Sequence, residues 1–308
     1  MKNNLRIIVY ILVILIVASL VALAATNQGM VYLGLPIIFI CMITSFIIHW
    51  LVFIPSYFAK TEKYYDLTGS ISYLITIFLA SFLTIKVSGE DIYFRSLLLV
   101  IFISVWTLRL GLFLFNRIMK SGEDKRFREI KISFFKFFLA WTISGLWVFL
   151  TSANALTAII NNMESSNDYF LYIGSVLWIT GLLFEVIADE QKKRFKADPE
   201  NTGEFITQGL WSISRHPNYF GEIILWFGIT IISFPTLQGW QLVTLLSPVF
   251  VYFLLTHISG INLLEKKANK TWGSLKRYQK YKERTPKLFP FLKLLNNGWI
   301  NTLLQKKN

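Results

Sequence analysis

Long apolar runs without charges are the feature that most constrains the fold of this chain. A helix that crosses a hydrocarbon core of about 30 Å needs about 20 mainly apolar residues. Eight windows meet this requirement, near residues 7–25, 31–54, 67–87, 93–115, 133–160, 168–188, 219–235 and 240–262. With 54% hydrophobic and only 16% charged residues, the composition disfavours a water-soluble fold. The sequence predicts an all-α, polytopic integral membrane helical bundle of about eight transmembrane helices, as one membrane domain over residues 1–308.

Lysine and arginine are distributed unevenly between the two ends of these segments. The stretches 1–6, 55–66, 116–132, 189–218 and 263–308 hold 27 of them, whereas only Lys86 and Arg95 lie at the opposite ends. Loops rich in these cations stay in the cytoplasm. We therefore expect both termini to be cytoplasmic, and the net charge of +13 to reflect topology rather than nucleic-acid binding.

Metal and nucleotide motifs of soluble enzymes do not occur in the sequence. The chain has one cysteine, Cys41, and three scattered histidines, His49, His216 and His257, and it contains no HExxH, CxxC, GxxxxGK[ST] or GxGxxG pattern. A disulfide framework is excluded, and no metal site is expected. His49 and His257 are expected to be packed helix residues.

Charges at membrane depth are costly and usually face a protein interior or a wet cavity. Arg109 and Glu185 are the clearest of these. Glu185, Asp189 and Lys193 recur at i, i+4 and i+8, which places them on one face of a helix. This face either leads from an apolar chamber to an anion site or forms a structural ladder of ion pairs.

The polar segment before the seventh predicted helix, and the first residues of that helix, carry the sharpest local pattern, Thr207-Gln-Gly-Leu-Trp-Ser-Ile-Ser-Arg-His-Pro-Asn-Tyr-Phe-Gly-Glu222. Pro217 favours an extended conformation at His216, so the residues around it are expected on a stiff entry to the next helix. Arg215 and the amides at a helix start suit a phosphate group. The alternative is a capped turn whose cations belong to the topology signal.

The basic C-terminal segment mixes cations with aromatic side chains. Trp272, Tyr278, Tyr281 and Arg284 lie within it, after Glu265. Interfacial aromatic belts and topogenic lysines are one explanation of such a segment. The other is that it joins the 189–218 segment, on the same predicted side, in forming one pocket.

Several short motifs occur along most of the chain. In the C-terminal half they are Ala188-Asp-Glu-Gln-Lys-Lys-Arg-Phe195, Asn201-Thr-Gly-Glu-Phe205, Gly209-Leu-Trp211, Ser214-Arg-His-Pro-Asn-Tyr-Phe-Gly-Glu222, Ser259-Gly260, Leu263-Leu-Glu265 and Tyr281-Lys-Glu-Arg-Thr-Pro286. In the N-terminal half they are Tyr65-Asp-Leu-Thr-Gly69, Leu108-Arg-Leu-Gly111 and Gly122-Glu-Asp-Lys-Arg-Phe127. In combination, these motifs resemble the uncharacterised, mostly microbial branch of the steroid 5-alpha-reductase superfamily. Arg-His-Pro-Asn-Tyr alone also resembles sterol delta-14 reductases and isoprenylcysteine carboxyl methyltransferases.

The resemblance implies a membrane reductase that NADPH enters from the cytoplasm. It would reduce an activated C=C bond of a lipophilic substrate, which is a steroid-like, isoprenoid or other lipid enone. Residues 1–165 would form the substrate side and residues 166–308 the cofactor-binding half. The implied cofactor-binding residues are Asp189, Lys193, Arg215, His216, Asn218, Tyr219, Glu222, Glu265, Tyr278, Tyr281 and Arg284. Neighbouring cations favour NADPH over NADH, because a 2′-phosphate needs positive partners.

Catalytic candidates are Glu185 and the pair Tyr65 and Asp66, one of which would polarise the substrate carbonyl or deliver a proton. Two other functions compete with the reductase. One is an S-adenosylmethionine-dependent membrane methyltransferase of the isoprenylcysteine type, and the other is a non-catalytic lipid-binding protein. The expected partners are a lipophilic small molecule and membrane lipids, with no nucleic acid and no obligate protein partner.

Overall fold

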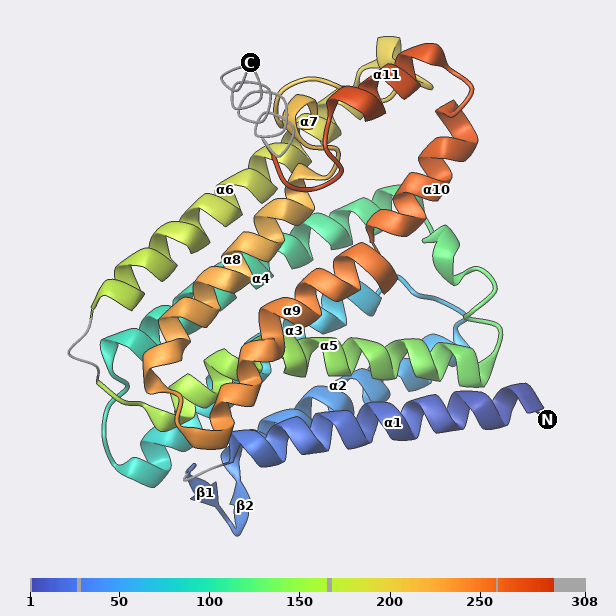
Figure 1. Ribbon diagram of the computed structural model, residues 1–308. Helices are drawn as coiled ribbons and strands as arrows, with labels where there is room; N and C mark the ends of the chain where they lie inside the picture. The colour runs from blue at the N-terminus through green and yellow to red at the C-terminus, as the bar shows by residue number, and fades with distance from the viewer. Residues whose placement is uncertain (1, 27–28, 165–167, 259, 291–308) are drawn as a thin grey trace, which may run out of the picture. The chain divides into compact units, whose positions relative to one another are not determined.

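The computed structural model describes residues 2–26, 29–164, 168–258 and 260–290. Ser259 and residues 291–308, including Lys293 of the basic C-terminal segment, lie outside the described residues. Within the described part, eight helical segments are long and apolar enough to cross a membrane (Figure 1). The predicted all-α class and number of segments are confirmed, and the chain is a multi-pass membrane protein.

The elements have the following bounds. The helices are α1 (Lys2–Ala25), α2 (Ile37–Phe58), α3 (Tyr65–Ser88), α4 (Phe94–Ser121), α5 (Phe134–Asn161), α6 (Tyr169–Ala197), α7 (Leu210–Ile213), α8 (Pro217–Ser233), α9 (Ser247–Phe253), α10 (Ile261–Trp272) and α11 (Lys276–Arg284). The 3-10 turns are η1 (Lys125–Phe127), η2 (Pro199–Asn201), η3 (Phe234–Thr236) and η4 (Gly239–Leu246), and η5 (Leu254–Ile258) is a π-helical turn. Strands β1 (Val31–Tyr32) and β2 (Leu35–Pro36) form a small antiparallel hairpin.

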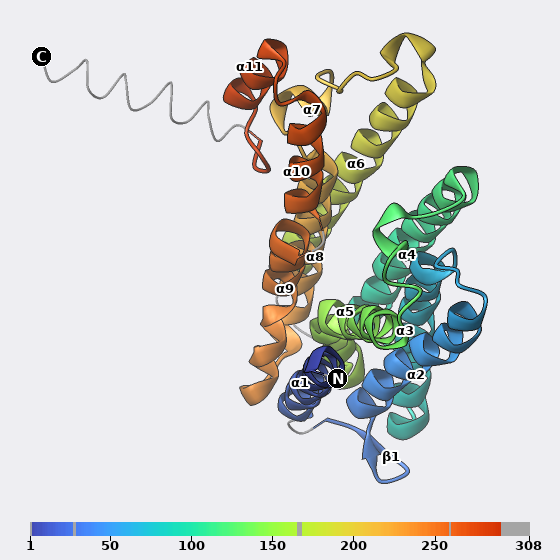
Figure 2. The same cartoon turned by 90° about the vertical axis from the view of Figure 1, so that its right-hand side faces the viewer.

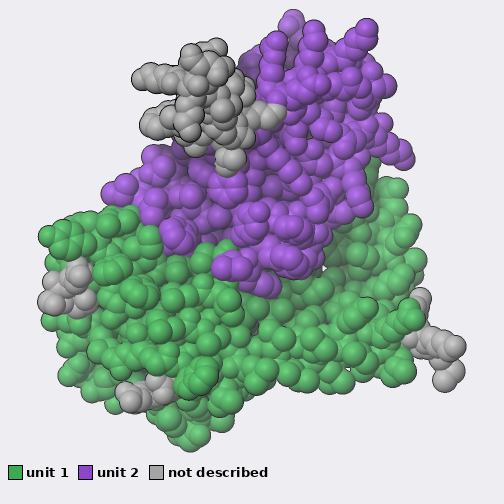
Figure 3. Space-filling view, in the orientation of Figure 1, with its two compact units in different colours: residues 1–174, 229–248 green, residues 175–228, 249–308 purple. Residues whose placement is uncertain are grey.

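Two compact units make up the chain (Figure 3). Unit 1 contains residues 1–174 and 229–248, and unit 2 contains residues 175–228 and 249–308. All the implied cofactor-binding residues therefore belong to unit 2, whereas Tyr65 and Asp66 belong to unit 1. The functional roles expected for residues 1–165 and 166–308 stay predictions.

In unit 1, α5 is the central helix and lies between α1, α2 and α3 (Figure 2). In its most apolar stretch 78% of the residues are buried, against 11% for α1. Helix α1 packs through a stripe of small residues, Ala18, Ala22 and Ala25, which are buried together with Ile11, while most of its other large side chains are exposed or half-exposed. Small residues allow helices to approach closely in a membrane.

Polar side chains join α2 to α5 inside unit 1. The Ser45 hydroxyl donates to the carbonyl of Gly145 at 2.6 Å, and the Trp50 indole N–H donates to the Thr142 hydroxyl at 3.2 Å. Cβ at Gly145 would lie 2.9 Å from the Phe46 ring, so α5 needs glycine there. Lipid tails are as apolar as the helix surfaces, so the hydrophobic effect does not drive membrane helices together. Interhelical hydrogen bonds of this kind help to hold them in contact.

The last membrane segment differs from the single helix expected over 240–262. Its described part passes through η4, α9 and η5, and α10 then begins at Ile261. Pro248 lies in the first turn of α9, where its missing N–H costs least. A Cβ at Gly260 would collide with the Leu255 carbonyl oxygen, so the chain turns tightly where only glycine fits.

Helix α6 extends nine residues beyond its expected end at residue 188, to Ala197. The charged residues of its last turns do not end the helix, because they continue its hydrogen-bonding pattern beyond the apolar stretch. Helix α8 begins at Pro217 rather than at residue 219, so Asn218 and Tyr219 lie in its first turn and not in an extended entry. Ser214, three residues before the proline, has an extended backbone with φ −147° and ψ 144°.

Candidate functional site

Two close-packed helices, α6 and α8, form the base of the site in unit 2. Cβ built on Gly181 would lie 2.5 Å from the Gly221 carbonyl oxygen, and Cβ on Gly221 would lie 2.5 Å from the Gly181 oxygen and 2.6 Å from the backbone nitrogen of Glu185. The two backbones therefore touch. This contact brings Glu222, next in sequence to Gly221, to the level of Glu185 on α6.

The contact between α6 and α8 at Gly181 and Gly221, here called the α6–α8 seam, has buried carboxylates beside it. Glu185 is 2% exposed, Glu222 6% and Asp189 7%. One turn nearer the start of α8, the Asn218 amide donates to Asp189 Oδ1 at 3.2 Å. Lys193 continues the predicted face, but its side chain is exposed and its Nζ lies 3.1 Å from Glu190 Oε2. Along α6 this face therefore carries buried carboxylates at Glu185 and Asp189, and an exposed ion pair at Lys193.

The segment before α8 is held against α6 by Gln191 and Trp211. Gln191 Oε1 accepts the backbone N–H of Leu210 at 2.9 Å, and the Trp211 indole donates to the Ala188 carbonyl at 3.0 Å. Gly209, between them, has φ 58° and ψ −132°. The positive φ favours glycine here, and a Cβ would displace the Gln191 amide from its contact with the Leu210 N–H.

Arg215, His216 and Glu265 meet at the start of α8 although Glu265 lies on α10, about fifty residues later. His216 Nε2 lies 2.9 Å from Glu265 Oε1, and Arg215 Nε lies 3.2 Å from the same oxygen. All three side chains are at most 15% exposed. Arg215 Nη1 also donates to the Lys282 carbonyl at 3.3 Å.

Burial lowers the pKa of His216 below its usual value, although the bond to Glu265 opposes this change. The ring is therefore neutral near pH 7. Since a carboxylate only accepts, the ring proton lies on Nε2, and Nδ1 is a hydrogen-bond acceptor. Nδ1 is buried and has no hydrogen-bond partner among the described residues.

The C-terminal segment runs beside residues 211–215 and fixes them. The Tyr281 hydroxyl donates to the Trp211 carbonyl at 2.6 Å, and the Arg215 N–H donates to the Pro286 carbonyl at 3.0 Å. The Ser214 hydroxyl donates to the Leu288 carbonyl at 2.7 Å. The backbone that carries Arg215 and His216 is thus held from two sides, by α6 and by this segment.

Four aromatic rings fasten this segment to the loop before α7. Phe205 lies 5.6 Å from Trp272, 5.0 Å from Tyr278 and 5.7 Å from Tyr281, measured between ring centroids. Burial raises the pKa of both tyrosines. In the described contacts Tyr278 and Tyr281 belong to the framework of the site, while Arg284 is exposed in the last turn of α11.

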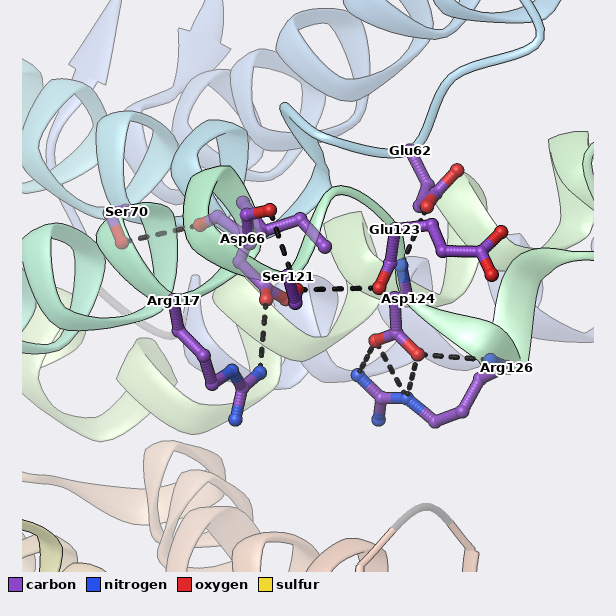
Figure 4. Close-up of polar contacts among 9 residues, drawn as sticks. Glu62, Asp66, Ser70, Arg117, Ser121, Glu123, Asp124 and Arg126 are labelled. Carbon is purple, nitrogen blue, oxygen red and sulfur yellow. Dashed lines mark hydrogen bonds and ion pairs between the residues drawn. The ribbon is translucent and has the colours of Figure 1, made fainter. Parts of the chain in front are cut away.

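Tyr65 and Asp66 lie at the start of α3 in unit 1. The Tyr65 hydroxyl donates to the Ala140 carbonyl at 2.9 Å, and its ring packs against Phe127 and Trp141. Asp66 Oδ2 lies 3.8 Å from Arg117 Nη2 (Figure 4). Both candidates have structural contacts, and their catalytic role stays a prediction.

Two residues with clear roles in these frameworks have no signal in the sequence. Glu62, 4% exposed, accepts the Asp124 backbone N–H at 2.7 Å (Figure 4). It also accepts the Lys131 ammonium at 2.7 Å, and so holds the loop between α4 and α5 in place. Gln191 lies within the 188–195 motif, but its side-chain amide is one polar group in a run of charged residues, and the sequence does not distinguish it from them. Their spacing follows no helical or metal-binding pattern.

Comparison with known proteins places the chain in a family. The model of the family described as "Protein of unknown function (DUF1295)" matches residues 52–285, which is most of the chain. The chain belongs to this steroid 5-alpha-reductase-like family. No solved structure matches the chain.

The relatives carry two kinds of name. A protein named "3-oxo-5-alpha-steroid 4-dehydrogenase 1" from Homo sapiens is 30% identical over 121 residues, which cover 39% of this chain and 41% of that protein. A protein named "Probable O-methyltransferase ustE" from Ustilaginoidea virens is 29% identical over 115 residues, or 32% of this chain and 40% of the relative. An uncharacterized protein of Schizosaccharomyces pombe is 24% identical over 238 residues, 66% of each chain. The chain thus spans about two fifths of the length of the two named relatives.

Proposed function

We propose that this protein is a membrane-embedded reductase that uses NADPH to reduce an activated C=C bond in a lipophilic substrate, with the cofactor site facing the cytoplasm. The observation that carries the proposal is the buried cluster of Arg215, His216 and Glu265, held in place by the C-terminal segment. Membership of the steroid 5-alpha-reductase-like family and relatives named as steroid dehydrogenases support it.

The residues of unit 2 fit a dinucleotide. The buried acceptor Nδ1 of His216 requires a donor, and the carboxamide and ribose hydroxyls of NADPH offer donors. Lys192, whose ammonium lies 4.5 Å from the Trp211 ring centroid, Arg215 and Arg284 provide positive charge for its phosphates. Arg215 would bind phosphate, and Glu265 would orient both Arg215 and the neutral ring of His216.

When bound, the reduced nicotinamide supplies a hydride to the electron-poor carbon of the alkene, and a proton must reach the other carbon to complete the new C–H bonds. In this proposal Glu185 holds or delivers that proton from the buried α6–α8 seam, where it is 2% exposed. Tyr65 and Asp66 remain the second candidate pair for the substrate carbonyl.

Equilibrium binding of NADPH, NADH and S-adenosylmethionine to the detergent-purified protein tests the proposal. NADPH is expected to bind selectively and more weakly at higher salt, since exposed charge interactions are screened. Arg215→Ala is expected to weaken NADPH binding by at least about tenfold, the effect of losing one charge-assisted contact. Arg277→Ala is the matched control, because Arg277 is exposed and pairs with Glu204 at 2.6 Å. Normal NADPH affinity in Arg215→Ala would refute the assigned pocket.

A membrane methyltransferase is the second candidate, favoured by the relative named as an O-methyltransferase. S-adenosylmethionine carries a sulfonium and one carboxylate, so it needs fewer cations than NADPH does. Binding of S-adenosylmethionine alone would establish that class instead. Binding of none of the three compounds would favour a non-catalytic lipid-binding protein.

A further inference from the structure

A cleft of about 370 Å³ lies in unit 2 beside the last turns of α6, and none of the residues assigned above to the cofactor lines it. Its lining residues come from α6, the turn around η2 and the segment that leads into α7, and they include Gln191, Arg194, Phe195, Asp198, Asn201 and Gln208. Gln191 and Phe195 each lie two residues after Asp189 and Lys193, which is about 200° around the helix. The cleft is therefore on the opposite side of α6 from the predicted cofactor face.

The size of the cleft limits what it can hold. Small-molecule sites have volumes of about 300–1,000 Å³, and this cleft is at the lower end of that range. It suits a ligand with one ring system rather than a whole dinucleotide.

Three amide side chains among the lining residues leave hydrogen-bonding groups for a ligand. Gln191 Oε1 accepts the Leu210 N–H at 2.9 Å, so its NH2 group remains as a donor. The Asn201 amide donates to Asp198 Oδ2 at 3.2 Å, so its oxygen remains as an acceptor. The exposed Gln208 side chain has no hydrogen-bond partner among the described residues. The lining thus offers both donors and acceptors, as the edge of a nucleobase requires.

The charges of the lining disfavour a phosphate group. Arg194 Nε already lies 2.9 Å from Glu190 Oε1, and the other charged lining residue, Asp198, is a carboxylate that repels anions. Phe195 is half-buried and provides an aromatic ring, and nucleobases stack on such rings. An uncharged ring with polar edges therefore fits the cleft.

We propose that this cleft binds the uncharged base of a nucleoside other than the cofactor, with amide side chains at the edge of the base and Phe195 at its face. Gln191 connects the cleft to the candidate site, because its Oε1 atom holds the Leu210 N–H at the start of α7. A base that accepts from the Gln191 NH2 group fixes this amide and, through it, the segment that leads to Arg215. Neither the binding nor this effect depends on the proposed reductase activity.

Isothermal titration of adenosine into the full-length protein in detergent, without NADPH, tests the site. Binding is expected to be insensitive to salt, because adenosine is uncharged, whereas the binding of NADPH is expected to weaken. Ribose and inorganic phosphate are expected not to displace adenosine, since neither has a ring that stacks on Phe195. Absence of adenosine binding would overturn the proposal.

Two substitutions in the lining are expected to weaken adenosine binding by about tenfold each. Phe195→Leu removes the stacking ring, and Gln208→Leu removes one amide that makes no hydrogen bond within the described residues. Gln279→Leu is the matched control, because Gln279 is an exposed glutamine on α11 that does not line the cleft. Equal affinities in all three variants would place adenosine elsewhere and refute the site.

Hydrogen–deuterium exchange measures the effect on the neighbouring segment. Adenosine is expected to slow the exchange of the backbone N–H groups of residues 209–215 in the wild type. Gln191→Glu keeps an acceptor for the Leu210 N–H but has no NH2 group, so this slowing is expected to be lost while exchange without adenosine stays as in the wild type. Equal slowing in Gln191→Glu would contradict the role of Gln191.

Adenosine added to protein saturated with NADPH separates two sources of the base. Retained adenosine affinity is expected, because the cleft and the predicted cofactor face are on opposite sides of α6. Displacement by NADPH would assign the cleft to the adenosine end of the cofactor and overturn the proposal. If NADPH itself does not bind, the reductase proposal fails, and the titration of adenosine alone still decides this one.

Discussion

His216 is kept neutral by burial, and this gives the site a dependence on pH. The pKa of the ring lies below its usual 6.5 in the folded protein. Above pH 6.5 the ring is neutral in both the folded and the unfolded states. Between the lowered pKa and 6.5, only the unfolded state binds the proton, so the free energy of unfolding falls as the pH falls.

We therefore expect the unfolding midpoint of the wild type to decrease below pH 6.5 more steeply than that of His216→Gln. Thermal unfolding across this range measures the difference, and the variant cancels the contribution of other titrating groups. NADPH affinity is expected to follow the same direction, since protonation of Nδ1 removes the acceptor. Parallel stability curves for the two proteins would show that His216 does not titrate differently on folding.

Glu185 provides a second prediction at the residue scale. Because it is buried in the α6–α8 seam while the cations lie nearer the ends of the helices, Glu185→Gln is expected to lower turnover by at least about tenfold, in the range of general acid–base effects. NADPH affinity should change by less than about twofold by the same argument. Glu190→Gln is the control, because Glu190 is exposed on the same helix and pairs with Lys193 and Arg194. Unchanged turnover in Glu185→Gln would assign Glu185 a purely structural role.

The contact between α6 and α8 depends on two glycines, and it supports a prediction at the scale of elements. Gly221→Ala places a methyl group 2.5 Å from the Gly181 carbonyl oxygen, so the helices must separate. The expected cost is about 1–3 kcal/mol, with weakened NADPH binding because Asn218 and Glu222 move with α8. In contrast, Gly69→Ala on α3 meets only Ser144 at 3.9 Å and is expected to be neutral or to stabilise by up to about 1 kcal/mol. Thermal unfolding of both variants measures the contrast, and equal losses would contradict the close approach at Gly221.

The elements also show how far sequence reasoning reaches. All eight membrane segments follow from hydropathy, because lipid requires long apolar stretches whatever the tertiary contacts are. The breaks in the last segment do not follow from hydropathy, since a 3-10 or π turn has the same composition as a helix. The charged end of α6 was missed because the expected helix ended with its apolar stretch.

The site was only partly accessible from the sequence. Glu185, Asp189 and Lys193 share a helix face that periodicity predicts. The meeting of Glu265 with Arg215 and His216 depends on a contact between α10 and the start of α8, which no local pattern encodes. The predicted topology brings their two segments to one side of the membrane, and the family resemblance assigns the three residues to one cofactor site. Gln191 and Glu62 act through backbone N–H groups, and such contacts leave no trace in residue spacing.

At the scale of the whole molecule, the distribution of cations predicts which ends of the helices face the cytoplasm. The connections that hold Lys125 and the 189–218 segment are on the predicted cytoplasmic side, while the β1–β2 hairpin and Glu90 are on the other. The single cysteine of the chain, Cys41, is fully buried, so it does not compete for a labelling reagent.

A cysteine introduced at an exposed position is therefore the thiol that a labelling reagent reaches. A membrane-impermeant maleimide is expected to label Leu33→Cys, at a position 86% exposed in the hairpin, in intact cells. Lys125→Cys, also exposed, is expected to react only after the membrane is permeabilised. The reverse pattern would invert the topology and move Arg215, His216 and Arg284 away from cytoplasmic NADPH. Because that result leaves the contacts within unit 2 intact, it would reject the proposed cofactor without rejecting the site.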